Sequence, residues 1–162
     1  MKVIGIAGWK NSGKTTLAER LVAEFVRRGL RVGAVKHAHH DFDTDREGTD
    51  SWRHRKAGAA RVAVVSDRRV ATIEELGDRP EPALHEILSG FAGFDLVVVE
   101  GYKREAHAKI ETRRREARDT GPLGAPNVVA IAADHAVAAE CPVFALDDVA
   151  AIADFIESLP AG

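Results

Sequence analysis

The stretch Gly8-Trp9-Lys10-Asn11-Ser12-Gly13-Lys14-Thr15 decides the fold, because it fits the pattern G-x-x-x-x-G-K-[ST] at every required position. The apolar run Val3–Ala7 before it is typical of a buried strand, and the spacing of apolar residues after Lys14 is typical of an amphipathic helix. Between a strand and a helix, such a loop can turn several backbone N–H groups toward a phosphate. The sequence therefore predicts a phosphate-binding loop.

The residue types in this loop favour a nucleoside triphosphate with Mg²⁺ as the ligand. We expect Lys14 to reach the β- and γ-phosphates, the Thr15 hydroxyl to bind Mg²⁺, and the Thr16 hydroxyl to meet the α-phosphate. The predicted nucleotide-binding residues of the segment are Gly8, Lys10, Asn11, Ser12, Gly13, Lys14, Thr15 and Thr16.

Strand and helix patterns alternate along the rest of the chain. After the first helix, which we expect to end near Gly29, Val32–Val35 predicts a second strand parallel to the first, and Leu96–Val99 a central strand. Other strands are predicted at Val62–Val65, Val70–Ile73 (at an edge), Val128–Ala132 and Val143–Ala145, and helices at 51–57 (capped by Asp50), 82–91 and 149–159. This alternation predicts an α/β, three-layer P-loop NTPase fold with a mostly parallel central sheet. The length of 162 residues predicts a single nucleotide-binding domain, 1–162.

Composition narrows the class of protein. The net charge of −2 does not favour a nucleic-acid binder, which usually has a basic excess. A single cysteine, Cys141, cannot form an intrachain disulfide and indicates a reducing compartment. Val3–Ala7 is too short for a signal peptide, and no apolar run reaches the roughly 20 residues of a membrane span. We therefore expect a cytoplasmic protein that binds neither nucleic acid nor membrane.

A triphosphate site also needs a carboxylate, and two acids are candidates. Glu100 ends the strand 96–99 and is expected to hold Mg²⁺ or the attacking water. Asp45 lies in the aspartate-rich loop 37–50 and is the second candidate for the metal. With Lys14, these two acids make up the predicted catalytic set. Asp134 follows the strand 128–132, where a carboxylate can accept hydrogen bonds from a guanine base.

Histidines and basic residues raise two further possibilities. His37, His39 and His40 could bind a transition metal, although adjacent residues of an extended segment point in opposite directions. An anionic second substrate or partner is the other possibility, and the residues expected to hold it are Lys36, His37, Arg53, Lys103 and Lys109.

Several segments together resemble one known family, over residues 1 to about 135. These are 11–17 (NSGKTTL), 35–45 (VKHAHHDFDTD), 48–53 (GTDSWR), 57–59 (AGA), 99–103 (VEGYK) and 109–111 (KIE). In combination they resemble the molybdopterin-guanine dinucleotide biosynthesis protein B (MobB) family. The histidine-rich loop and the VEGYK segment make the resemblance more specific than the phosphate loop alone.

The resemblance implies a homodimeric protein that binds GTP and hydrolyses it weakly with Mg²⁺. It implies an adaptor or nucleotide donor in molybdenum cofactor biosynthesis, acting with the partner enzyme MobA, which joins GMP to molybdopterin. The residues themselves leave three alternatives open. These are a small-molecule kinase with 113–118 as its lid, a metal-delivery protein that uses the histidines, and a scaffold that binds nucleotide only to fix its shape.

Overall fold

The computed structural model describes residues 1–38 and 42–160, and its contacts divide the chain into two compact units. The first unit comprises Met1–His37 with Leu84–Gly162, and the second Ala38–Ala83. Each unit is described by itself below. The single domain expected from the chain length stays a prediction.

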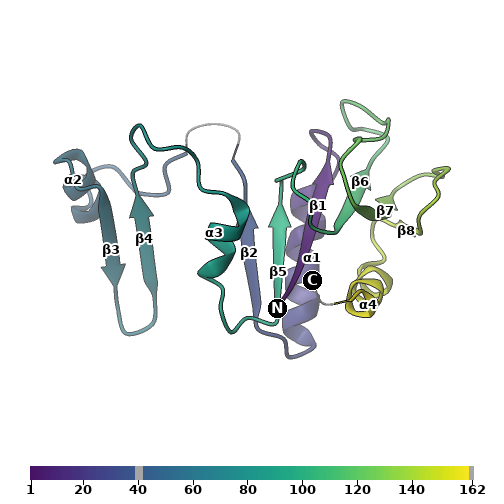
Figure 1. Cartoon of the computed structure of the whole chain (residues 1–162), viewed down its shortest axis with the longest axis horizontal. Helices are drawn as coiled ribbons and strands as arrows, with labels where there is room; N and C mark the ends of the chain where they lie inside the picture. Colours follow the sequence, from purple (N-terminus) through teal and green to yellow (C-terminus); the bar gives the residue numbers. More distant parts are fainter. Residues whose placement is uncertain (39–41, 161–162) are drawn as a thin grey trace. The chain divides into compact units, whose positions relative to one another are not determined.

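The first unit is built on a six-stranded sheet in which every strand pair is parallel (Figure 1). The strand order is β2-β5-β1-β6-β7-β8. The bounds are β1 Lys2–Gly8, β2 Val32–Lys36, β5 Leu96–Glu100, β6 Lys109–Arg113, β7 Val128–Ala133 and β8 Val143–Ala145. The predicted α/β class with a mostly parallel sheet is confirmed, and β5 occupies the interior position expected from its apolar run.

Helices on both faces of the sheet complete the three predicted layers. Helices α1 (Lys14–Arg27) and α4 (Val149–Ser158) pack on one face, and the short helix α3 (Leu84–Ser89) packs on the other. Strand β5 contributes to a hydrophobic core on each face of the sheet. Leu96 and Val98 pack in the core with α1 and α4, and Val97 and Val99 pack in the core with α3. None of the helices in the described ranges has the length and apolar character needed to cross a bilayer.

The strand ends determine where a ligand can bind. Strand β1 lies between β5 and β6, and its last residue Gly8 is in register with Thr112 of β6. On the other side of β1, Ile6 is in register with Glu100 of β5, and Glu100 is in turn in register with Lys36 of β2. The carboxyl ends of these parallel strands therefore meet at one edge, where open α/β sheets bind their ligands.

The second unit contains helix α2 (Asp50–Lys56) and an antiparallel pair, β3 (Arg61–Val65) and β4 (Val70–Glu74). Both strands were predicted, and they pair with each other in a two-stranded sheet of their own. Only residues 66–69 separate them, which suits a hairpin, whereas a parallel pairing needs a long crossover. The predicted cap was wrong, because the Thr49 side chain accepts from Trp52 N and caps α2 in place of Asp50.

Lys2 fixes the end of α4 to the start of β1. Its Nζ donates to three main-chain oxygens, those of Ile156, Glu157 and Leu159, at 2.6–2.8 Å. A cation at this position satisfies carbonyls that a helix end leaves unpaired, and it also complements the helix dipole. We therefore expect Lys2→Met to lower the free energy of unfolding by about 1–3 kcal/mol in urea denaturation. Lys2→Arg should retain most of the stability of the wild type. If Lys2→Met were as stable as the wild type, Lys2 would not stabilise the contact between α4 and β1.

Candidate functional site

The predicted loop leaves β1 and enters α1 as a turn with left-handed backbone. Asn11 has φ 64°, and Gly13, the N-cap of α1, has φ 92°. Positive φ is readily available to glycine and tolerated by asparagine, so the residue types fit the turn. Next to the turn lies a cavity of ≈440 Å³ lined by Asn11, Ser12, Gly13, Lys14, Thr15, Thr16, Arg114 and Glu116. The loop is therefore open toward a space that a phosphate chain could occupy.

A close approach to β6 fixes the loop at its start. A Cβ atom at Gly8 would lie 2.5 Å from Thr112 Oγ1 and 2.6 Å from Thr112 O, so only glycine fits. The buried hydroxyls of Ser12 and Thr112 are hydrogen-bonded at 2.7 Å, and Thr112 also donates to Ala7 O at 3.2 Å. The sequence did not indicate Thr112, because it lies 100 residues from Ser12 along the chain.

Lys14 points back over the loop. Its Nζ donates to Trp9 O at 2.8 Å, which holds the ammonium group beside the turn. Burial is the main reason why the pKa of Lys14 is lowered; Glu100 acts against this effect, and Lys36 and Lys103 add to it. An anion in the cavity would offset the desolvation of this ammonium group and favour its charged form.

Thr15 and Glu100 meet as expected. Thr15 Oγ1 donates to Glu100 Oε1 at 2.8 Å, and Lys36 Nζ lies 3.5 Å from the same oxygen. Glu100 is at the carboxyl end of β5, and its side chain is only 13% exposed. Two neighbouring oxygen ligands of an octahedral Mg²⁺ lie about 3 Å apart, so this pair fits the ion. Among the described residues no group of three or more His, Cys, Asp or Glu could hold a metal, but Mg²⁺ often uses one or two carboxylates with phosphates.

Asp45 lies in the second unit and has partners there. Its carboxylate accepts from Ser51 at 2.8 Å and Thr49 at 3.1 Å, and Arg55 Nε lies 3.5 Å away. These contacts organise the segment before α2. The role of Asp45 as a metal ligand stays a prediction.

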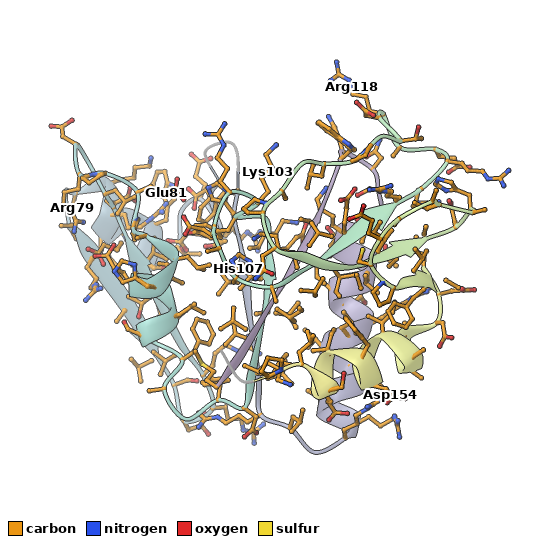
Figure 2. All side chains as sticks on the ribbon, turned by 45° about the vertical axis from the view of Figure 1, so that its right-hand side comes forward. Arg79, Glu81, Lys103, His107, Arg118 and Asp154 are labelled. Carbon is orange, nitrogen blue, oxygen red and sulfur yellow. The ribbon has the colours of Figure 1, made fainter. Side chains whose placement is uncertain are left out.

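Of the residues predicted to bind a transition metal or an anion, those that the structure describes are divided between the two units. His37 stacks on Tyr102, with ring centroids 4.6 Å apart, whereas His39 and His40 lie outside the described residues. Lys103, labelled in Figure 2, has its Nζ 5.7 Å from the centre of the Trp9 ring in the phosphate loop. Arg53 belongs to α2 of the second unit, where it is exposed and lies 4.0 Å from Asp50.

Lys109 does not have the surroundings of an anion-binding residue. It is fully buried, and its Nζ donates to the main-chain oxygens of Glu105, His107 and Pro126. It begins β6, at the end of the strand opposite to Thr112 and the phosphate loop. We therefore correct the expectation for Lys109 and assign it to structural support of the segment before β6.

A second cavity of ≈470 Å³ adjoins the phosphate loop. It is lined by Gly13, Thr16, Leu17, Arg20, Arg114, Ala133, Asp134, Ala145, Leu146 and Asp147. Asp134 Oδ1 accepts from Arg115 N at 3.0 Å and is 2.8 Å from His135 Nδ1, and the His135 contact is the main reason why the pKa of Asp134 is lowered. Asp134 thus lines a cavity together with Gly13 and Thr16 of the phosphate loop, and its role in reading a base stays a prediction.

The irregular segment 114–127 borders both cavities through Arg114, and the sequence indicated it only as the lid 113–118 of the kinase alternative. Trp9 Nε1 donates to Gly121 O at 2.9 Å, and Arg118 N donates to Lys10 O at 3.3 Å, so the segment is fastened to the phosphate loop. Arg114 lines both cavities. The run Arg113–Arg115 in the sequence indicated a basic segment. The sequence did not show that β6 ends at Arg113, so that Arg114 lies at the site.

Comparisons with known proteins agree with this geometry. The family model described as MobB, molybdopterin guanine dinucleotide synthesis protein B, matches residues 3–134. The molybdopterin-guanine dinucleotide biosynthesis adapter protein of Haemophilus influenzae is 36% identical to this chain, over 96% of this chain and 88% of its own. The adapter protein of Escherichia coli is 37% identical, over 95% of this chain and 90% of its own. The crystal structure of Bacillus subtilis MobB covers both chains fully at 28% identity and TM-score 0.80. The crystal structure of a MobB protein homolog from Bacillus stearothermophilus is 31% identical in sequence. It matches 98% of this chain and 100% of its own chain, with a TM-score of 0.75.

His107 gives a prediction about pH. Its ring nitrogens are buried, and neither has a hydrogen-bond partner among the described residues. Burial, with a smaller contribution from Lys109, lowers the pKa of His107 to about 4. Since an unfolded histidine titrates near 6.5, the unfolded state takes up the proton first. The stabilising contribution is thus complete above about pH 6.5 and is lost as pH falls toward 4.

We expect urea unfolding of His107→Leu to show a weaker decrease in stability between about pH 6.5 and 4 than the wild type does. The matched control is His85→Leu, which replaces an exposed histidine of α3 and should keep the wild-type profile. Identical pH profiles for His107→Leu and the wild type would show that His107 does not cause the loss of stability at low pH.

Proposed function

The chain belongs to the MobB family, and from that premise we propose that it is an adapter of molybdopterin guanine dinucleotide biosynthesis that binds GTP with Mg²⁺. The observation that carries the proposal is the open phosphate loop with Lys14, Thr15 and Glu100 at the carboxyl edge of the sheet. The relatives from Haemophilus influenzae and Escherichia coli are named as adapters of this biosynthesis, and the similarity covers most of each chain.

The phosphates would be held mainly by backbone N–H groups of the loop, among them those of Gly13, Lys14 and Thr15. Lys14 would exchange its hydrogen bond to Trp9 O for the β- and γ-phosphates, an exchange of a neutral acceptor for an anion. Thr16 would donate to the α-phosphate, and Lys10 would add positive charge at the outer side of the loop. Asp134 is proposed to accept hydrogen bonds from the guanine base in the neighbouring cavity.

Mg²⁺ would be held by Thr15 and Glu100, with Asp45 as a further candidate. When bound, the ion would neutralise charge on the phosphates. Lys36 lies against Glu100 and would keep the carboxylate oriented. Slow hydrolysis of GTP is part of the proposal, with Lys14 stabilising the charge on the phosphates and Glu100 holding the metal or the attacking water.

The partner is proposed to be a MobA-like guanylyltransferase or its anionic pterin, approached by Lys36, His37, Arg53 and Lys103. A homodimer is also proposed, as the resemblance to the family implies. Exposed valines of the β3–β4 hairpin, Val64, Val65 and Val70, supply apolar surface that a second copy could cover. Gel filtration with light scattering would report the dimer, and a monomer at micromolar concentrations would contradict it.

The direct test of nucleotide binding is calorimetry with GTP and ATP, with and without Mg²⁺. We expect the wild type to bind GTP more tightly than ATP, and Lys14→Ala to weaken GTP binding about 10- to 100-fold, because a charged hydrogen bond is lost. The matched control is Arg31→Ala, which removes one positive charge from an exposed residue before β2. A wild type that binds neither nucleotide would contradict the proposal.

Glu100 should determine how strongly Mg²⁺ supports binding. We expect Glu100→Gln to reduce the gain in GTP affinity on adding Mg²⁺ about tenfold, because the metal loses a charged ligand. Binding without Mg²⁺ should stay equal or become tighter, because a negative charge near the phosphates is removed. Glu19→Gln on the exposed side of α1 is the control. Equal Mg²⁺ dependence in Glu100→Gln and the wild type would exclude this role.

A further inference from the structure

Arg114 lies where the two cavities of the first unit meet. It lines both the phosphate-side cavity and the Asp134 cavity, together with Gly13 and Thr16. Its stem passes over the N-terminus of α1, because a Cβ atom at Gly13 would lie 3.1 Å from Arg114 Cδ. A nucleotide that fills both cavities would therefore have to pass beside this side chain.

The guanidinium group of Arg114 is held by two carboxylates, one toward each cavity. Its Nη2 donates to Glu116 Oε2 at 3.3 Å, and Glu116 lines the phosphate-side cavity. Its Nε lies 3.7 Å from Asp134 Oδ2, in the other cavity. The Arg114 side chain is 40% exposed, so these are screened ion pairs that an incoming ligand can replace.

We propose that Arg114 is a phosphate-binding residue of this site, and that Glu116 occupies its guanidinium group until a nucleotide phosphate replaces it. The inference rests on the proposed function, since it deepens the recognition of the nucleotide. A phosphate group offers guanidinium two oxygens and more negative charge than the Glu116 carboxylate does. The exchange also frees Asp134 Oδ2 from Arg114, so the carboxylate can accept from the base.

The main chain on either side of Arg114 is held in place, which confines the exchange to side chains. On one side, Arg113 is paired with Ala133 of β7, and its main-chain oxygen accepts from Asp134 N at 3.3 Å. On the other side, Arg115 N donates to Asp134 Oδ1 at 3.0 Å. Arg114 can therefore change its partner while its Cα stays beside both cavities.

The exchange predicts opposite effects for the two partners. Arg114→Ala should weaken GTP binding about 10- to 100-fold, because a charged contact to phosphate is lost. Glu116→Gln should tighten GTP binding about two- to fivefold, because a competing partner of Arg114 is removed. Inorganic triphosphate should respond in the same direction as GTP in both variants, since the contact is to phosphate.

Calorimetry of the full chain with GTP and with inorganic triphosphate tests this. Arg118→Ala is the control for the arginine, because Arg118 is on the same segment and its side chain extends outward in Figure 2. Asp119→Asn is the control for the acid, because it also removes one negative charge from this segment and its side chain can still accept from Gly121 N. Both controls should bind within about twofold of the wild type, as expected of exposed charges outside the site.

The double variant separates an exchange from simple charge repulsion. In Arg114→Ala/Glu116→Gln the gain from Glu116→Gln should vanish, because there is no guanidinium group to release. If the gain persists there, or if Arg114→Ala binds GTP like the wild type, the proposal is overturned. Arg114→Lys should recover part of the affinity, and equal thermal unfolding midpoints would show that the variants fold. A wild type that binds no GTP would overturn the proposed function together with this inference.

Discussion

The site depends on the close approach of β1 to β6 at Gly8. The end of β1 comes so near Thr112 that a side chain at position 8 would collide with the neighbouring strand. The same contact lets the Thr112 hydroxyl bind both Ser12 and Ala7 O, which fastens the two ends of the turn. Because both ends of the turn are held by hydrogen bonds, less conformational entropy is lost when a ligand binds to it.

Charge at this edge of the sheet is balanced around one acid. Glu100 accepts from Thr15, is paired with Lys36 and interacts with Lys14, so one carboxylate serves several positive or donor groups. Burial lowers the pKa of Lys14, and the proposed polyanion would favour the charged form of its ammonium group. Glu116 has a comparable relation to Arg114, as the internal partner that a phosphate replaces in our proposal.

The sequence predicted the centre of the site better than its border. The meeting of Lys14, Thr15 and Glu100 could be predicted because local motifs and strand ends determine it. Lys109 could not be placed, since the sequence did not show which end of β6 it occupies; it begins the strand and is buried. Arg114 was indicated only as part of the kinase lid 113–118, because its place beside the phosphate loop depends on where β6 ends. The valine runs of β3 and β4 predicted strands correctly, but a run of valines does not specify the strand with which it pairs.

The central claim is that the backbone N–H groups of the loop from Gly8 to Thr15 converge on a polyanion. Amide NMR spectra of the labelled chain, recorded while GDP is added, test it most directly. The account predicts large downfield proton shifts for the amides of Gly13, Lys14 and Thr15, as N–H groups donate to phosphate oxygens, and small changes in α4. Shifts confined to residues outside the loop, or an unchanged spectrum at saturating nucleotide, would contradict it.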